Sequence, residues 1–175
     1  MHLRHLPLLR VLVTFAAASC CTGVSSALAQ ESTTQQRRVQ ALADALLVRL
    51  DIAAQVQVSM VETNRLLLSV EPVPDASRVF TLKVEEAFAA TLDDDELGAA
   101  IAHELGHVWI FTHHPFLQTE QLANEVAMRL VSRESLAQLY DKVWKRGGAK
   151  GDLTRFLGPD TSSLGLAPAP SSPTP

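Results

Sequence analysis

The sequence predicts an α+β domain in which a small antiparallel or mixed sheet packs on two neighbouring helices. Apolar residues recur at helical spacing near the start and in the middle of the chain, whereas three short stretches between residues 55 and 85 alternate apolar and polar residues. Residues 1–29 and 158–175 have compositions that do not suit a packed core. We therefore expect one folded domain over residues 30–157.

The first 29 residues are typical of a secretory signal peptide. Basic residues precede an apolar run from Val11 to Ala18, and the stretch Ala27–Ala29 is a small-x-small cleavage site before Gln30. The apolar run is too short to span a membrane. We expect a periplasmic or secreted protein that begins at Gln30. Cleavage before Cys20 is the alternative, and only this lipidated form is expected to associate with a membrane.

The composition of the remaining chain argues against nucleic-acid binding. Removal of residues 1–29 leaves 15 − 2 = 13 basic residues against 19 acidic residues, a net charge of −6. Both cysteines are also removed, so an exported domain would have no disulfide to stabilise it. The 175 − 29 = 146 residues that remain are enough for one sizeable core.

The first elements change from helical to strand periodicity. Residues at helical spacing predict a first helix over about 34–50. Alternation then predicts strands over 55–60 and 66–70, joined as a hairpin by a turn at Thr63-Asn64, and a third strand over 79–85. A short helix over 85–90 follows. Asp93 and Glu96 form a capping box for a longer helix from about Asp94 to Thr112.

The C-terminal part contains a basic cluster and then a tail rich in Pro and Ser. From Gly158 onward the composition predicts disorder. The basic cluster comprises Lys142, Lys145, Arg146, Lys150 and Arg155. The simpler interpretation is that these bases complement the dipole of a helix that ends at Gly147-Gly148, and the alternative is binding of anionic lipid or an acidic partner.

The central helix carries an HExxH pattern. His103 and His107 are four residues apart and therefore lie on one face, so both imidazoles can reach one ion. Glu104 lies about 100° around the helix, where it can approach a water bound to that ion. The flanking residues are apolar nearly all round, and buried imidazoles need a partner that zinc can provide. A pair of core histidines without metal is the simpler alternative.

The segment LDDDELGAAIAHELGHV resembles the zinc metallopeptidases of the HtpX/Oma/BepA type. Downstream, Glu120 followed by Ala123 and Asn124 is similar to their second motif, which usually has Asp at the position of Asn124. An ExxAN pattern is similar instead to the ImmA/IrrE-type metallopeptidases. The resemblance covers roughly residues 79–130. It implies a zincin-like, gluzincin-type fold in which two histidines and a glutamate bind zinc.

The third ligand is predicted to be Glu120 rather than His113 or Glu125. A ligand at His113 would need a helix break at a glycine where Ile110 stands, and on an unbroken helix His113 points away from His107.

Helix geometry also favours Glu120. If the long helix ends near Thr112 and Pro115 opens the next one, Glu120 returns level with the histidines. Asn124, one turn later, could then hydrogen-bond a ligand histidine, whereas Glu125 would face solvent.

These patterns lead us to expect an exported zinc metalloendopeptidase with one zinc ion per chain. Glu104 would act as general base on a zinc-bound water and hydrolyse peptide bonds of peptide or unfolded-protein substrates. The strand at 79–85 resembles the edge strand that such enzymes pair with a substrate, and an ordinary sheet strand is the alternative. Candidate transition-state stabilisers are His113, His114, Arg129, Arg133 and Tyr140. The alternative function is a non-proteolytic, zinc-stabilised binding or chaperone-like module.

Overall fold

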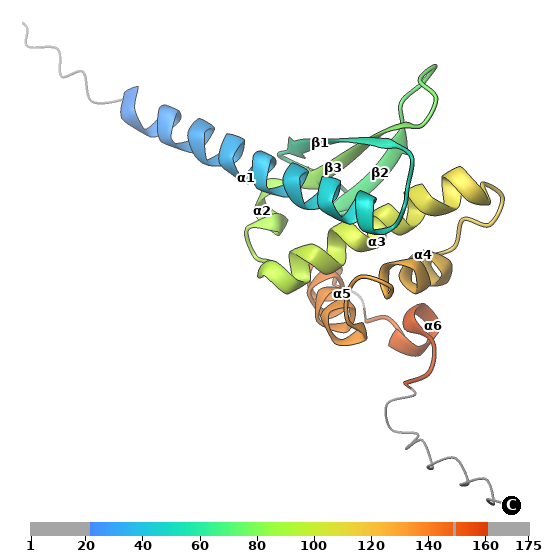
Figure 1. Cartoon of the computed structure of the whole chain (residues 1–175). Helices are drawn as coiled ribbons and strands as arrows, with labels where there is room; N and C mark the ends of the chain where they lie inside the picture. The colour runs from blue at the N-terminus through green and yellow to red at the C-terminus, as the bar shows by residue number, and fades with distance from the viewer. Residues whose placement is uncertain (1–21, 149, 161–175) are drawn as a thin grey trace, which may run out of the picture.

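The computed structural model describes residues 22–148 and 150–160, with side chains from residue 30 onward. Within these residues a mixed three-stranded sheet is combined with six helices, an α+β architecture (Figure 1). The elements in order are α1 (Thr22–Arg49), β1 (Gln55–Val61), β2 (Leu68–Pro72), β3 (Val79–Glu85), α2 (Glu86–Ala89), α3 (Asp94–His113), α4 (Glu120–Ala127), α5 (Arg133–Gly147) and α6 (Leu153–Leu157).

The sheet order is β1-β3-β2, so the predicted hairpin between residues 55–60 and 66–70 is wrong. β3 lies between the two, parallel to β1 and antiparallel to β2. Val58 and Val70 each pair with Leu82, from opposite sides. The alternation of residues identified the face of each strand that is buried, but it contains no information on which strand is the neighbour.

The expectation that β3 is a substrate-binding edge strand is also wrong, because β3 is the central strand of the sheet. The free edges belong to β1 and β2. At the β1 edge, the Gln40 side chain donates to the Val56 carbonyl and accepts from the Val58 N–H, both at 2.8 Å, and Gln36 donates to the Val58 carbonyl at 3.0 Å. These glutamines of α1 occupy the groups that another strand would use. On the other side of the sheet, Glu104 of α3 is a helix side chain that bonds the β2 backbone, at Val70.

One face of the sheet forms the core. Phe80, Leu82 and Val84 of β3 are buried, and α1 and α3 pack on the sheet (Figure 1). α4 and α5 pack on α3, and α6 packs on α4 and α5. α3 therefore lies in the middle of the domain. None of the helices in the described ranges is long and apolar enough to cross a membrane.

The helix boundaries agree closely with the sequence where capping signals exist. Asp93 accepts from the Glu96 N–H and the Glu96 side chain accepts from the Asp93 N–H, both at 2.8 Å, which forms the predicted capping box. α5 ends at Gly147, and Gly148 takes the left-handed conformation (φ 65°). α1 is longer than predicted, because it begins at Thr22. Residues 1–21 of the expected signal peptide and residues 161–175 of the expected tail lie outside the described residues.

Three of the five C-terminal bases form ion pairs within the domain. Lys142 and Arg146 contact the buried carboxylates of Glu96 and Glu85, and Lys145 pairs with Asp141. These bases lie in the second half of α5, as the helix-dipole interpretation expects. Their partners belong to the domain itself, so these three charges have an intramolecular role.

Candidate metal centre

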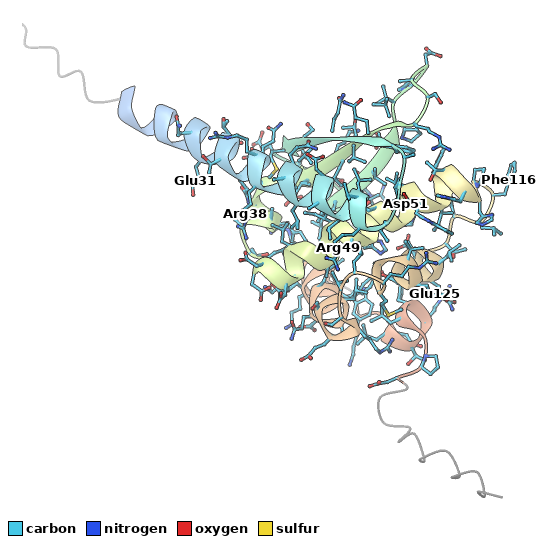
Figure 2. All side chains as sticks on the ribbon, viewed as in Figure 1. Glu31, Arg38, Arg49, Asp51, Phe116 and Glu125 are labelled. Carbon is cyan, nitrogen blue, oxygen red and sulfur yellow. The ribbon has the colours of Figure 1, made fainter. Side chains whose placement is uncertain are left out.

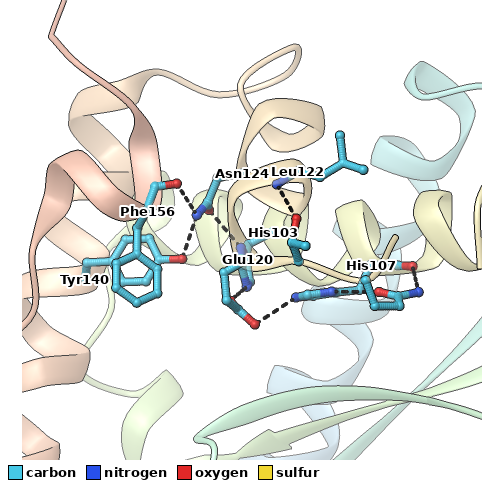
Figure 3. Close-up of polar contacts among 9 residues, drawn as sticks. His103, His107, Glu120, Leu122, Asn124, Tyr140 and Phe156 are labelled. Carbon is cyan, nitrogen blue, oxygen red and sulfur yellow. Dashed lines mark hydrogen bonds and ion pairs between the residues drawn. The ribbon is translucent and has the colours of Figure 1, made fainter. Parts of the chain in front are cut away.

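The two histidines of the HExxH pattern project from the same face of α3. The ring centroids of His103 and His107 are 4.9 Å apart, and their side chains are 13% and 21% exposed. The rest of α3 around them is buried, with Ala102, Leu105 and Val108 inaccessible to solvent. The helix thus holds both imidazoles rigidly at the edge of the core, with their Nε2 atoms turned toward α4 (Figure 3).

Gly106 allows α4 to approach α3 closely. A Cβ atom at this position would lie 2.3 Å from the backbone carbonyl oxygen of Ala123 in α4, a distance that no side chain could occupy. Backbone therefore contacts backbone where the two helices cross. The glycine within HELGH positions the second helix of the site.

α4 begins at Glu120, so the expectation that Pro115 opens this helix is wrong. Thr119 is its N-cap and accepts from the Leu122 N–H at 3.2 Å. Residues 114–119 form a connection, because a capping hydroxyl at Thr119 defines the start better than a proline four residues earlier. Glu120 nevertheless returns to the level of the histidines.

Glu120 faces both imidazoles. Its Oε2 lies 3.2 Å from His103 Nε2, and its Oε1 lies 3.6 Å from His107 Nε2 (Figure 3). One ligand atom from each of the three residues lies within 4.8 Å of the others. The residues predicted as ligands are thus brought together as a group that could hold a metal ion.

The opposite ring nitrogens are hydrogen-bonded. His103 Nδ1 lies 2.8 Å from Asn124 Oδ1, and His107 Nδ1 lies 3.2 Å from Gln118 Oε1. Gln118 also donates to the His107 carbonyl at 3.4 Å. When Nδ1 donates to an amide oxygen, Nε2 keeps its lone pair and can bind a metal, so the donor set fits zinc.

Gln118 was not identified from the sequence. It lies in the connection between α3 and α4, two residues before Glu120, and no periodic pattern marks it. Its role in orienting the His107 ring is apparent only from the structure, in which Gln118 Oε1 lies within hydrogen-bonding distance of His107 Nδ1.

Electrostatics in the site link Glu104, His107 and Glu120. Burial raises the pKa of Glu104, which is only 8% exposed, although the neighbouring histidines oppose the shift. Burial alone would lower the pKa of His107, but its hydrogen bond to Glu120 and the charge of Glu104 outweigh this effect and raise it. Hydrogen bonds from His103 and His107 hold the pKa of Glu120 well below its usual range. These interactions keep Glu120 ionised beside the imidazoles, and an ionised carboxylate is the form that binds a cation.

A cavity of about 260 Å³ adjoins the site. Besides His103, Glu104 and Glu120, it is lined by Leu66, Leu68, Ala100, Leu139, Tyr140 and Val143. Its remaining wall is apolar except for the hydroxyl of Tyr140. Burial raises the pKa of Tyr140 to about 12, so this hydroxyl stays protonated.

The other candidates from the sequence lie elsewhere. The ring of His113 stacks on Trp109 with centroids 4.5 Å apart, and its Nδ1 bonds the Trp109 carbonyl at 2.8 Å. Glu125 is exposed on α4, where Gln121 donates to it at 3.1 Å (Figure 2).

The basic candidates for transition-state stabilisation also have other contacts. His114 lies near the same tryptophan ring, and Arg129 lies over it. Arg133 donates to the backbone carbonyls of Leu157 and Gly158 at the end of α6. Of the five proposed stabilisers, Tyr140 is the one that lines the cavity beside the cluster.

Comparison with known proteins identifies no family. No family model matches the sequence, and no curated protein matches it. Among solved structures, the fold is similar to that of the crystal structure of the metallopeptidase zymogen of Pyrococcus abyssi abylysin, with 15% identity and a TM-score of 0.46 over 65% of this chain and 99% of that chain. A likeness at this level does not establish a family, and the interpretation of the site rests on its own geometry.

Proposed function

We propose that the protein is an exported zinc metallopeptidase that hydrolyses peptide bonds. The observation that carries this proposal is the convergence of His103, His107 and Glu120 on one point beside the buried carboxylate of Glu104. Two imidazoles and one carboxylate, with a position left for water or substrate, are typical of catalytic zinc sites. When bound, zinc supplies a Lewis acid and lowers the pKa of water toward neutrality.

Glu104 is suited to move the proton in this reaction. It follows His103 directly on α3, so its carboxylate reaches the same cavity as the ligand group without belonging to it. Its pKa is raised by burial, which makes the carboxylate a better base than an exposed glutamate. We assign Glu104 to accept a proton from the attacking water and to deliver it to the leaving amine.

The open edge of β2 supports a peptide as the substrate. A hydrogen bond from the Val70 backbone is among the interactions that act on Glu104, so this strand passes directly beside the reactive carboxylate. Leu68, on the same strand, lines the cavity. An extended segment of a peptide or unfolded protein could pair with the part of this edge that Glu104 leaves open, because β2 is an outer strand of the sheet.

Tyr140 is the best-placed group to stabilise charge on the substrate carbonyl oxygen. Its hydroxyl oxygen accepts a hydrogen bond from Asn124 at 2.8 Å, so its own proton can be directed into the cavity. A neutral phenol in a partly dry pocket is an effective donor to a developing negative charge. Tyr140 and Glu104 line the same cavity, where Tyr140 would donate a hydrogen bond and Glu104 would accept a proton.

Degradation of an unfolded model protein tests the proposal. The zinc-loaded protein should cleave the substrate, a chelator should stop cleavage, and added zinc should restore it. Glu104→Gln should keep its zinc and its circular dichroism spectrum while the rate falls by about 10² or more, as loss of a general base typically costs. Equal rates in the two zinc-loaded proteins would contradict the assigned mechanism. Zinc binding without any hydrolysis would favour the alternative binding or chaperone-like module.

A further inference from the structure

The side chain of Asn124 connects the metal centre to the C-terminal helix α6. Asn124 is completely buried in α4. Its Oδ1 lies 2.8 Å from His103 Nδ1, while its Nδ2 donates to the Phe156 carbonyl at 3.0 Å and to the Tyr140 hydroxyl at 2.8 Å (Figure 3). Both the oxygen and the nitrogen of this buried amide therefore have hydrogen-bond partners.

The Phe156 carbonyl fixes the orientation of the amide. A carbonyl oxygen can only accept, so the atom of Asn124 that faces Phe156 must be the NH₂ group. The oxygen must then face His103, and it can only accept, so His103 must carry its proton on Nδ1. When His103 is neutral, its lone pair therefore lies on Nε2, the atom that faces Glu120 and can bind a metal in place of its contact with this carboxylate.

α6 is itself held in place by specific contacts. Arg133 of α5 donates to the Leu157 carbonyl and, at 2.7 Å, to the Gly158 carbonyl. The Leu157 side chain is 5% exposed within the core, and the Phe156 ring lies 5.2 Å from that of Tyr140, centroid to centroid. The carbonyl that orients Asn124 is therefore presented by a docked, rather than a loose, segment.

We propose that α6 is a positioning element of the metal centre, so that zinc binding and docking of α6 strengthen each other through Asn124. The proposal rests on the metal centre proposed above. Metal binding at Nε2 strengthens Nδ1–H as a donor, and hydrogen bonds in a chain reinforce one another. Linkage requires the reverse effect: release of α6 lowers zinc affinity by the same factor by which zinc favours docking.

Hydrogen exchange and zinc titration of the full chain test this coupling. In the intact protein, zinc should slow exchange of the amides in residues 153–157 by about tenfold, the lower end of the range for groups that support a metal ligand. Arg133→Ala removes two contacts of α6 without touching a ligand, so it should weaken zinc binding by about tenfold in competition with a chromophoric chelator. The matched control Arg129→Ala alters an arginine that lies over Trp109, and its zinc affinity should stay within about twofold.

Asn124→Asp gives a second test that does not depend on Arg133. An aspartate can still accept from His103 but has no N–H to donate to the Phe156 carbonyl. Zinc should still bind to this variant but should no longer slow exchange in α6. Zinc that binds the intact protein without changing exchange in α6, or that protects α6 equally in Asn124→Asp, would overturn the coupling and leave the metal centre standing. Failure of the intact protein to bind zinc would overturn both proposals.

Discussion

At the scale of single residues, the site consists of ligand atoms and the groups that orient them. His103 and His107 were identified by their spacing, because a four-residue interval on a helix places two side chains on one face whatever the rest of the fold does. Glu120 could be inferred because two adjacent helices joined by a short connection bring residues at similar heights together. The structure brings these three residues together.

The groups around the ligands were only partly predictable. Asn124 lies one helical turn after Glu120, and its contact with a histidine was expected from that interval. Gln118 has no such regularity, because it belongs to a connection whose path depends on the packing of both helices. The donation of Asn124 to the Phe156 carbonyl of α6 requires an amide, because a carboxylate has no N–H to donate.

Tyr140→Phe tests the role of the phenol. The variant retains the ring, which lies 5.2 Å from Phe156, but removes the hydroxyl that we place opposite the substrate carbonyl. Removal of one donor to a developing oxyanion typically lowers kcat by about 10²–10³. Zinc affinity should change far less, because the hydroxyl contacts Asn124 and no ligand. A zinc affinity that falls as much as kcat would show that Tyr140 only supports Asn124, and an unchanged kcat would remove it from the mechanism.

At the scale of elements, the helices were more predictable than the sheet. α3 is marked by a capping box and α5 by paired glycines, and both signals act locally along the chain. The position of β3 between β1 and β2 depends on contacts between distant residues, and the alternating pattern is the same in a central and in an edge strand. This is why the hairpin and the substrate-binding edge were assigned to the wrong strands.

Gly106→Ala tests whether the close approach of α3 and α4 forms the metal centre. The new methyl group would meet the Ala123 carbonyl, so the helices must separate and carry Glu120 away from the histidines. Overpacking of this kind typically costs about 1–3 kcal/mol in the free energy of unfolding, and zinc affinity should fall with it.

Gly98→Ala is the matched control on the same helix. A Cβ at Gly98 meets nothing within 4 Å, so this variant should keep its zinc affinity and gain up to about 1 kcal/mol from helix propensity. Chemical denaturation and zinc titration of both variants check the comparison. Equal zinc affinity in Gly106→Ala and Gly98→Ala would contradict the proposed dependence on helix contact.

At the scale of the whole molecule, the domain places a polar site against a tightly packed centre. α3 carries the histidines and is surrounded by the sheet, α1, α4 and α5, so the ligands start from a rigid support (Figure 1). The connection after α3 instead carries exposed apolar side chains, among them Phe116, which is 98% exposed (Figure 2). The two histidines are thus anchored in the packed part of the domain, where supporting side chains can hold their geometry.

The N-terminus offers a prediction for the whole chain. Because Ala27–Ala29 forms a small-x-small site, we expect the exported protein to begin at Gln30. Within the described structure, cleavage there leaves the Gln36 and Gln40 contacts with β1 intact, so the mature domain should keep its fold. Intact-mass spectrometry of the exported protein checks this, and a diacylglyceryl group on Cys20 would establish the lipoprotein form instead.

The most direct test of the metal centre is a zinc titration that compares the two glutamates of α4. The intact protein should bind one zinc ion per chain. Glu120→Gln should weaken binding sharply, because Glu120 faces both Nε2 atoms. Glu125→Gln on the exposed side of the same helix, and His113→Ala against Trp109, should leave the affinity almost unchanged. The reverse ranking, or zinc binding that Glu120→Gln does not weaken, would contradict the assignment of His103, His107 and Glu120 as the metal ligands.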